Sequence, residues 1–173
     1  MAKKALIIVD MLNDFIDKKG ALFCGETVAP IIPFIQERLQ VYRDRKDLVI
    51  YLQDSHATDD KEFQRFPKHS VTGSWGSEII SELKPLPKET VIPKKRYSGF
   101  FRTDLEDVLT SGVVDEVEVV GVCTSICVMD TVGGLANRDY KVRVPVKGVA
   151  DFNPDFHTFS LQRMEQIYGA DVS

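Results

Sequence analysis

Short apolar runs alternate along this chain with segments of helical periodicity, and this alternation is what most restricts the fold. The runs are rich in Val and Ile, which is typical of strands buried on both faces of a parallel sheet. They lie at residues 5–9, 48–52, 90–92 and 117–120, and a fifth, more alternating run lies at 142–146. Expected helices follow these runs at 28–42, 75–83, 103–112 and 155–168, and a further helix follows the run at 117–120. We therefore expect an α/β protein with three α/β/α layers and a central, mostly parallel sheet, similar to Rossmann-like folds.

Chemically capable residues follow the expected strands at the point where each one ends. Asp10 follows the first strand, Asp54 ends the second and Lys94 follows the third. The fourth leads into a cysteine-containing turn within residues 121–131. Because ligands of such sheets bind beyond the carboxyl ends of the strands, we expect these positions to converge on one site.

The segment 121–131 predicts a strand-to-helix turn that carries Cys127 in the first turn of a helix. Thr124 or Ser125 is a suitable cap for that helix. Unpaired backbone N–H groups and the helix dipole would stabilise a thiolate at Cys127, as a nucleophile requires. The alternative is a buried structural cysteine, and this segment alone does not decide between the two.

A nucleophilic thiol also needs a proton acceptor and a nearby positive charge. Asp10 can accept the thiol proton and return it to a leaving amine, unless it is merely a solvated aspartate at a strand end. Lys94 can supply the charge, but with Lys95 and Arg96 beside it the residues alone favour a basic surface patch.

The turn before the cysteine helix is also a candidate oxyanion hole. Backbone N–H groups at Cys123 and Cys127 would point at one site. For the Cys123 side chain we expect a structural role, because its spacing from Cys127 is not that of a Cys-x-x-Cys redox pair.

A second candidate site lies in the long polar segment 55–76. Asp54 and His56 are two residues apart in extended chain and can face one point, and His69 follows further on. Two histidines and a carboxylate suit Zn²⁺, Fe²⁺ or Mn²⁺, although these residues could equally be ordinary polar loop residues. We interpret His157, in the last expected helix, as an exposed histidine without a role.

Composition restricts the partners. The 173 residues suit a single domain spanning 1–173, and a net charge of −4 without a basic run argues against nucleic acid. No run is long enough for a membrane span, and the early first strand leads us to expect no signal peptide. Three cysteines without paired spacing argue against a disulfide framework and favour the cytoplasm. We expect a small-molecule substrate, and a homo-oligomer remains open.

Taken together, these motifs resemble the isochorismatase-like cysteine hydrolase superfamily, and most of all the nicotinamidases, also called pyrazinamidases. The resemblance runs from residue 5 to about residue 170, and its specificity comes from the shared order of several modest motifs. These motifs lie at residues 7–15, 54–56, 66–69, 73–76, 94–100 and 121–131.

The resemblance implies roles for individual residues. It implies a catalytic triad, a divalent metal, zinc above all, and an aromatic pocket, and the pattern Lys-x-Arg-Tyr-Ser selects Lys94 over Lys95 for the triad. It also implies a cis peptide bond before Cys123. The implied residues are the triad Asp10, Lys94 and Cys127, the metal ligands Asp54, His56, His69 and, as in some members, Glu62, and the ring-covering residues Phe15, Phe66 and Tyr97.

The activity implied is hydrolysis of nicotinamide and pyrazinamide to the acid and ammonia through a cysteine thioester, as in NAD salvage. The alternative is another small-amide or N-carbamoyl hydrolase with the same triad; such relatives need no metal. A non-catalytic scaffolding relative is disfavoured by the intact triad. Two departures stand out: the loop before His69 lacks a histidine that some members carry, and little chain remains for a terminal strand.

Overall fold

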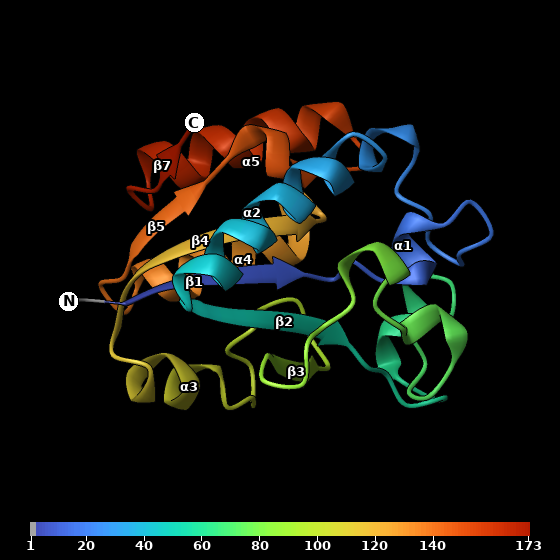
Figure 1. The fold of residues 1–173 in the computed structure, drawn as a ribbon. Coiled ribbons are helices and arrows are strands. Elements are labelled where there is room, and N and C mark those ends of the chain that lie inside the picture. Colours follow the sequence, from blue (N-terminus) through green and yellow to red (C-terminus); the bar gives the residue numbers. More distant parts are fainter. Residues whose placement is uncertain (1–2) are drawn as a thin grey trace.

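The computed structural model describes residues 3–173 and contains a seven-stranded sheet at its centre (Figure 1). The strand order is β3-β2-β1-β4-β5-β7, β6 pairs with β4, and every pairing between these strands is parallel. The strands are β1 (Lys3–Val9), β2 (Leu48–Asp54), β3 (Thr90–Lys94), β4 (Val114–Val122), β5 (Lys141–Val144), β6 (Val149–Ala150) and β7 (Asp171–Val172). The expected parallel sheet is confirmed, and so is the minimal terminal strand.

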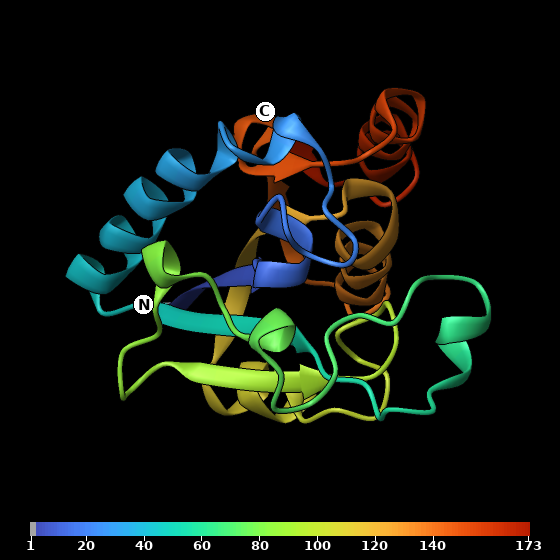
Figure 2. The ribbon, with the colours of Figure 1, turned by 90° about the vertical axis from the view of Figure 1, so that its right-hand side faces the viewer.

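Helices cover both faces of this sheet, which gives the expected three layers (Figure 2). Along β1, alternate residues enter different cores: Ile7 belongs to the core that includes Leu105 and Met164, whereas Ile8 belongs to the core that includes Phe15 and Ile35. The α-helices are α1 (Asn13–Ile16), α2 (Ile31–Arg45), α3 (Leu105–Ser111), α4 (Met129–Ala136) and α5 (Pro154–Gln166). Within residues 3–173, no helix has the length and apolar character that a membrane crossing requires.

Strand register places the ends of β1, β2, β3 and β4 at one edge of the sheet. Val9 pairs with Leu52 on one side and with Gly121 on the other, while Asp54 pairs with Lys94. Gly121 has a φ of 117°, and a β-carbon there would lie 2.1 Å from the carbonyl oxygen of Val9. The close approach of β1 and β4 at this edge therefore requires glycine.

The helix expected at 75–83 is wrong. The structure has two short 3₁₀ turns there, η3 (Trp75–Ser77) and η4 (Ser81–Leu83). The backbone between them pairs with the segment after β1: Ile79 forms an antiparallel bridge with Leu12, and the Ile80 N–H donates to the Met11 carbonyl. These tertiary hydrogen bonds replace the ones that a continuous helix would make.

Four further short turns connect the elements. They are η1 (Glu26–Val28), η2 (Lys61–Gln64), η5 (Thr124–Val128) and η6 (Val146–Gly148). The η5 turn is π-helical and α4 begins directly after it, so the segment expected to begin an α-helix starts with a wider turn.

Candidate active site

Lys94 lies at the centre of the convergent strand ends and is 1% exposed. Its Nζ is 2.7 Å from Oδ2 of Asp10 and 3.3 Å from Sγ of Cys127, and it also contacts the carboxylate of Asp54. Lys95 is exposed. The surface-patch interpretation of Lys94 is therefore wrong, because β3 carries this side chain into the interior while its neighbour points to solvent.

Asp10 and Asp54 share the Lys94 charge but differ in proton affinity. Burial, together with the negative charge of Asp54, raises the pKa of Asp10 to about 6 even though Lys94 opposes the shift. Burial acts in the same direction on Asp54, but Lys94 and His56 outweigh it and lower the pKa of Asp54 to about 2. Asp10 is therefore the carboxylate better suited to take up a proton near neutral pH.

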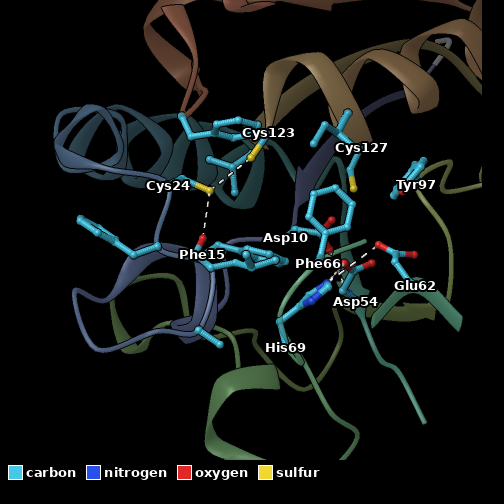
Figure 3. Close-up of a pocket in the computed structure, with 16 residues that line it drawn as sticks. Asp10, Phe15, Cys24, Asp54, Glu62, Phe66, His69, Tyr97, Cys123 and Cys127 are labelled. Carbon is cyan, nitrogen blue, oxygen red and sulfur yellow. Dashed lines mark hydrogen bonds and ion pairs between the residues drawn. The ribbon is translucent and has the colours of Figure 1, made fainter. Parts of the chain in front are cut away.

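Cys127 is buried in the η5 turn, with its sulfur facing the Asp10 and Asp54 carboxylates (Figure 3). The peptide bond between Val122 and Cys123 is cis, as the resemblance implied. Burial raises the pKa of Cys127 well above its ordinary value, and the two carboxylates add to this effect against Lys94. These effects oppose the thiolate expected at Cys127, and Asp10 lies within reach of the thiol proton.

The cap expected from Thr124 or Ser125 is also wrong. Neither side chain caps the turn; instead Oδ2 of the buried Asp151 accepts the Ser125 N–H at 2.7 Å. The Thr124 hydroxyl lies 2.9 Å from Nδ1 of His157, which is half-buried rather than exposed. His157 thus fastens the turn to α5, a contact between distant segments that local sequence does not indicate.

Four side chains from β2 and the loop after it surround one small space. Asp54, His56 and His69 present ligand atoms that all lie within 4.8 Å of one another. Nε2 of His69 is 3.9 Å from Oδ2 of Asp54 and also 3.9 Å from Oε1 of Glu62, while Nε2 of His56 is 3.5 Å from Oδ2 of Asp54. Such spacing leaves room for a cation at ordinary ligand distances from each atom.

The chemistry of these atoms fits a divalent cation. Nδ1 of His69 donates to the Pro67 carbonyl at 2.7 Å, so its Nε2 is left as an acceptor. Nε2 of His56 and Oε2 of Glu62 are buried and have no hydrogen-bond partner among the described residues. Buried polar atoms are costly without partners, and a cation would satisfy both of them.

A cavity of about 360 Å³ joins the triad to the four residues around the space that fits a cation (Figure 3). Asp10 and Cys127 line it together with Asp54, Glu62 and His69. The three expected ring-covering residues, Phe15, Phe66 and Tyr97, line it as well. His56 and Lys94 lie behind this first layer of side chains.

Sequence reasoning missed several lining residues, among them Phe23, Cys24 and Phe152. The sulfur of Cys24 lies 3.2 Å from that of Cys123, so the partner of Cys123 is Cys24 rather than Cys127. All three cysteines are free thiols. The loop carrying Cys24 is remote in sequence, and no local pattern could have indicated this contact.

Comparison with known proteins gives a consistent result. The isochorismatase domain family matches residues 4–173. The structure of nicotinamidase PncA from Bacillus subtilis is similar, with 36% identity, 99% of each chain covered and a TM-score of 0.93. An N-carbamoylsarcosine amidase from Thermoplasma acidophilum is 32% identical over 99% of this chain and 95% of that one, with a TM-score of 0.89. A pyrazinamidase of Pyrococcus horikoshii, in complex with zinc, is 28% identical over 99% and 98%, with a TM-score of 0.91.

The fold, the site and these similarities define a hydrolase of the three-layer α/β/α class that includes amidohydrolases. The chain belongs to the isochorismatase family. The resemblance inferred from the sequence motifs is thereby confirmed, and so is the fold class.

Proposed function

We propose that this protein is a nicotinamidase, which hydrolyses nicotinamide and pyrazinamide to the corresponding acid and ammonia and acts in NAD salvage. One observation supports this above all. Cys127 opens onto the same cavity as Asp54, Glu62 and His69, which form the cation-fitting group together with His56. A pyridine carboxamide has an amide at one end and a ring nitrogen at the other. The cavity offers a nucleophile for the first and a cation site for the second.

Acylation uses the triad. The Cys127 sulfur attacks the amide carbon, and its proton passes to Asp10 as the S–C bond forms. Asp10 then gives this proton to the amide nitrogen, the C–N bond breaks and ammonia leaves. Burial disfavours the charge of Lys94, but Asp10 and Asp54 outweigh it and hold the pKa of Lys94 well above its ordinary value. Lys94 therefore stays an ammonium ion and orients the carboxylates and the sulfur.

Water completes the cycle. It attacks the thioester carbon while Asp10 takes its proton, the C–S bond breaks, and the thiol recovers a proton as the acid is released. In both steps the backbone N–H groups of Cys123 and Cys127 would stabilise the negative oxygen.

Asp54, His56 and His69 would hold a divalent cation, with Glu62 as a fourth protein ligand. When bound, a cation with an open coordination position supplies an anchor for the ring nitrogen of the substrate. Zinc is supported by the zinc complex of the similar pyrazinamidase, and Fe²⁺ and Mn²⁺ suit the same ligands. Phe15, Phe66 and Tyr97 would cover the substrate ring and exclude water.

The test is ammonia release from nicotinamide, pyrazinamide and benzamide, with and without a chelator. Benzamide keeps the shape and the amide but lacks the ring nitrogen, and a site built around a polar partner rejects such an analogue strongly. We expect release from the first two amides, very little from benzamide, loss of activity on chelation and recovery with Zn²⁺, Mn²⁺ or Fe²⁺.

N-carbamoylsarcosine is the matched alternative substrate, because an amidase for it is 32% identical to this chain. Equal rates on benzamide and nicotinamide, or full activity of verified metal-free protein, would contradict the proposal. Preferential turnover of N-carbamoylsarcosine would instead favour an N-carbamoyl hydrolase that uses the same triad.

A further inference from the structure

Asp60 lies behind the cation-fitting group and is not among the ligands that the sequence indicated. Its side chain is 7% exposed, and its backbone immediately precedes the η2 turn. Oδ1 accepts the Glu62 N–H at 2.9 Å, and Oδ2 lies 3.1 Å from Nδ1 of His56. One carboxylate therefore contacts two of the four candidate ligand residues.

The contact with His56 determines which ring nitrogen is available to a cation. A carboxylate paired with an arginine only accepts hydrogen bonds, so Nδ1 of His56 carries a hydrogen, and the neutral ring that binds a cation keeps its lone pair on Nε2. That Nε2 is the buried atom without a partner, and it faces Oδ2 of Asp54. The Pro67 carbonyl likewise accepts from Nδ1 of His69, which leaves the lone pair of His69 on Nε2.

The contact with Glu62 fixes the backbone of a second candidate ligand. Glu62 lies in the first turn of η2, and the Asp60 side chain caps that turn through the Glu62 N–H. Because this turn is short, the cap restrains the position of the Glu62 carboxylate as well as that of its backbone.

Arg96 holds Asp60 in place. Its Nη1 is 3.2 Å from both carboxylate oxygens of Asp60. Arg96 follows two residues after Lys94, at the exit of β3, and its side chain is 38% exposed. The Arg96–Asp60 pair therefore joins the loop of the candidate cation site to the strand that carries the triad lysine.

We propose that Asp60 is a positioning residue, which fixes the tautomer and ring orientation of His56 and the backbone of Glu62 so that both can bind a divalent cation. The binding of a cation here rests on the proposed function, whereas the contacts of Asp60 with His56 and Glu62 are features of the structure itself. Outer-sphere partners of this kind typically change metal affinity by about 10- to 100-fold.

The central experiment measures the Zn²⁺ affinity of purified metal-free protein by competition with a chromophoric chelator. Asp60→Asn keeps the size of the side chain but leaves one acceptor oxygen for two N–H groups, and its amide can donate to Nδ1 of His56. We expect roughly 10- to 100-fold weaker Zn²⁺ binding. Asp59→Asn, at the exposed neighbouring aspartate, is the matched control and should bind as the wild type does.

A second measurement separates positioning from a general structural effect. Long-range ¹⁵N–¹H NMR of metal-free protein should show His56 with hydrogen on Nδ1 in the wild type and in Asp59→Asn. In Asp60→Asn the Nε2-protonated form should gain population, while the rest of the NMR spectrum remains that of a folded protein. If Asp60→Asn does not fold, Arg96→Gln replaces it, because Arg96 reaches solvent and its loss should still weaken Zn²⁺ binding severalfold.

The outcomes distinguish this inference from the proposed function. Wild-type Zn²⁺ affinity and an unchanged His56 tautomer in a folded Asp60→Asn protein would overturn the role of Asp60 and leave the nicotinamidase proposal standing. A wild-type protein that binds none of Zn²⁺, Mn²⁺ and Fe²⁺ would overturn both.

Discussion

The ammonium nitrogen of Lys94 lies 3.3 Å from the sulfur of Cys127, although two strands separate β3 from β4 in the sheet. The Lys94 side chain meets Asp54 and Asp10 at the ends of β2 and β1, and the η5 turn after β4 brings Cys127 to the same point. A single buried cation thus contacts a thiol and two carboxylates. Charge balance and the geometry of the nucleophile therefore depend on the same residue.

This relationship predicts that Asp10, Lys94 and Cys127 act as one unit. Asp10→Asn and Lys94→Met should each reduce kcat/KM by several orders of magnitude, and the double variant should be little worse than either single one. Lys94→Met leaves buried carboxylates without a counter-charge, so circular dichroism must accompany the kinetics. Lys95→Ala, at the exposed neighbour, should retain activity; an equal loss there would contradict the role of Lys94.

The three free thiols should differ sharply in function. Cys127→Ala should abolish turnover while leaving the fold intact, because its sulfur is the one facing Asp10 and Lys94. Cys123→Ala should retain substantial activity, since its side chain contacts Cys24 rather than the triad. Mass spectrometry after treatment with an aldehyde analogue of nicotinamide should locate the adduct on Cys127. An adduct on Cys123 or Cys24 would disprove this assignment.

Gly121 should be irreplaceable for stability. A β-carbon there would lie 2.1 Å from the Val9 carbonyl oxygen and 2.8 Å from the Val9 nitrogen, and neither backbone atom can move without disturbing β1. Gly121→Ala should reduce the free energy of unfolding by about 3 kcal/mol or more. Gly25→Ala is the control, because Gly25 also has a positive φ but has no atom within 4 Å of such a β-carbon. Equal losses in urea denaturation would contradict the steric explanation.

The ion pair between Arg43 and Glu89 should make stability depend on pH. Burial of Glu89 acts to raise its pKa, but hydrogen bonds from Arg43 and from the Leu86 N–H outweigh burial and hold this pKa below the ordinary 4.5. Because the pKa is lowered on folding, the stabilisation is present above pH 4.5 and is lost as the pH falls through the lowered value. Glu89→Gln should cost about 1–3 kcal/mol at pH 7, and the difference from the wild type should shrink in acid.

Thermal melts of the wild type and of Glu89→Gln between pH 7 and pH 3 would show whether their stability difference shrinks in acid. Glu82→Gln, at an exposed glutamate, should show no comparable effect at any pH. A difference for Glu89→Gln that stayed constant with pH would mean that packing, rather than charge, is responsible.

Much of the site could be predicted because its residues follow apolar runs. Once the runs at 5–9 and 48–52 are interpreted as parallel strands, Asp10 and Asp54 must lie at one edge of the sheet. The role of Lys94 was harder to predict, because three consecutive basic residues are also typical of a solvated surface patch. The family resemblance selected Lys94 over Lys95, and the register of β3, which pairs Lys94 with Asp54, agrees with that choice.

Other features depended on contacts that no local pattern contains. Asp59 and Asp60 have the same side chain, and only the position of Arg96 and His56 in space distinguishes them. The cap of the η5 turn comes from Asp151, 26 residues away from Ser125. The raised pKa of Cys127 likewise depends on its burial and on the carboxylates of Asp10 and Asp54, which the local sequence does not contain.

The strand order also has a consequence for how activity is acquired during folding. Lys94 and Cys127 are 33 residues apart in sequence, and the Asp54 N–H that donates to Asp10 comes from 44 residues further along the chain. Each reactive group is thus delivered by a different strand, and loop closure must precede every one of these contacts. A partly folded chain therefore lacks the complete triad. Turnover would consequently return during refolding only at the rate at which the last strand docks. Recovery of activity would therefore measure completion of the whole fold.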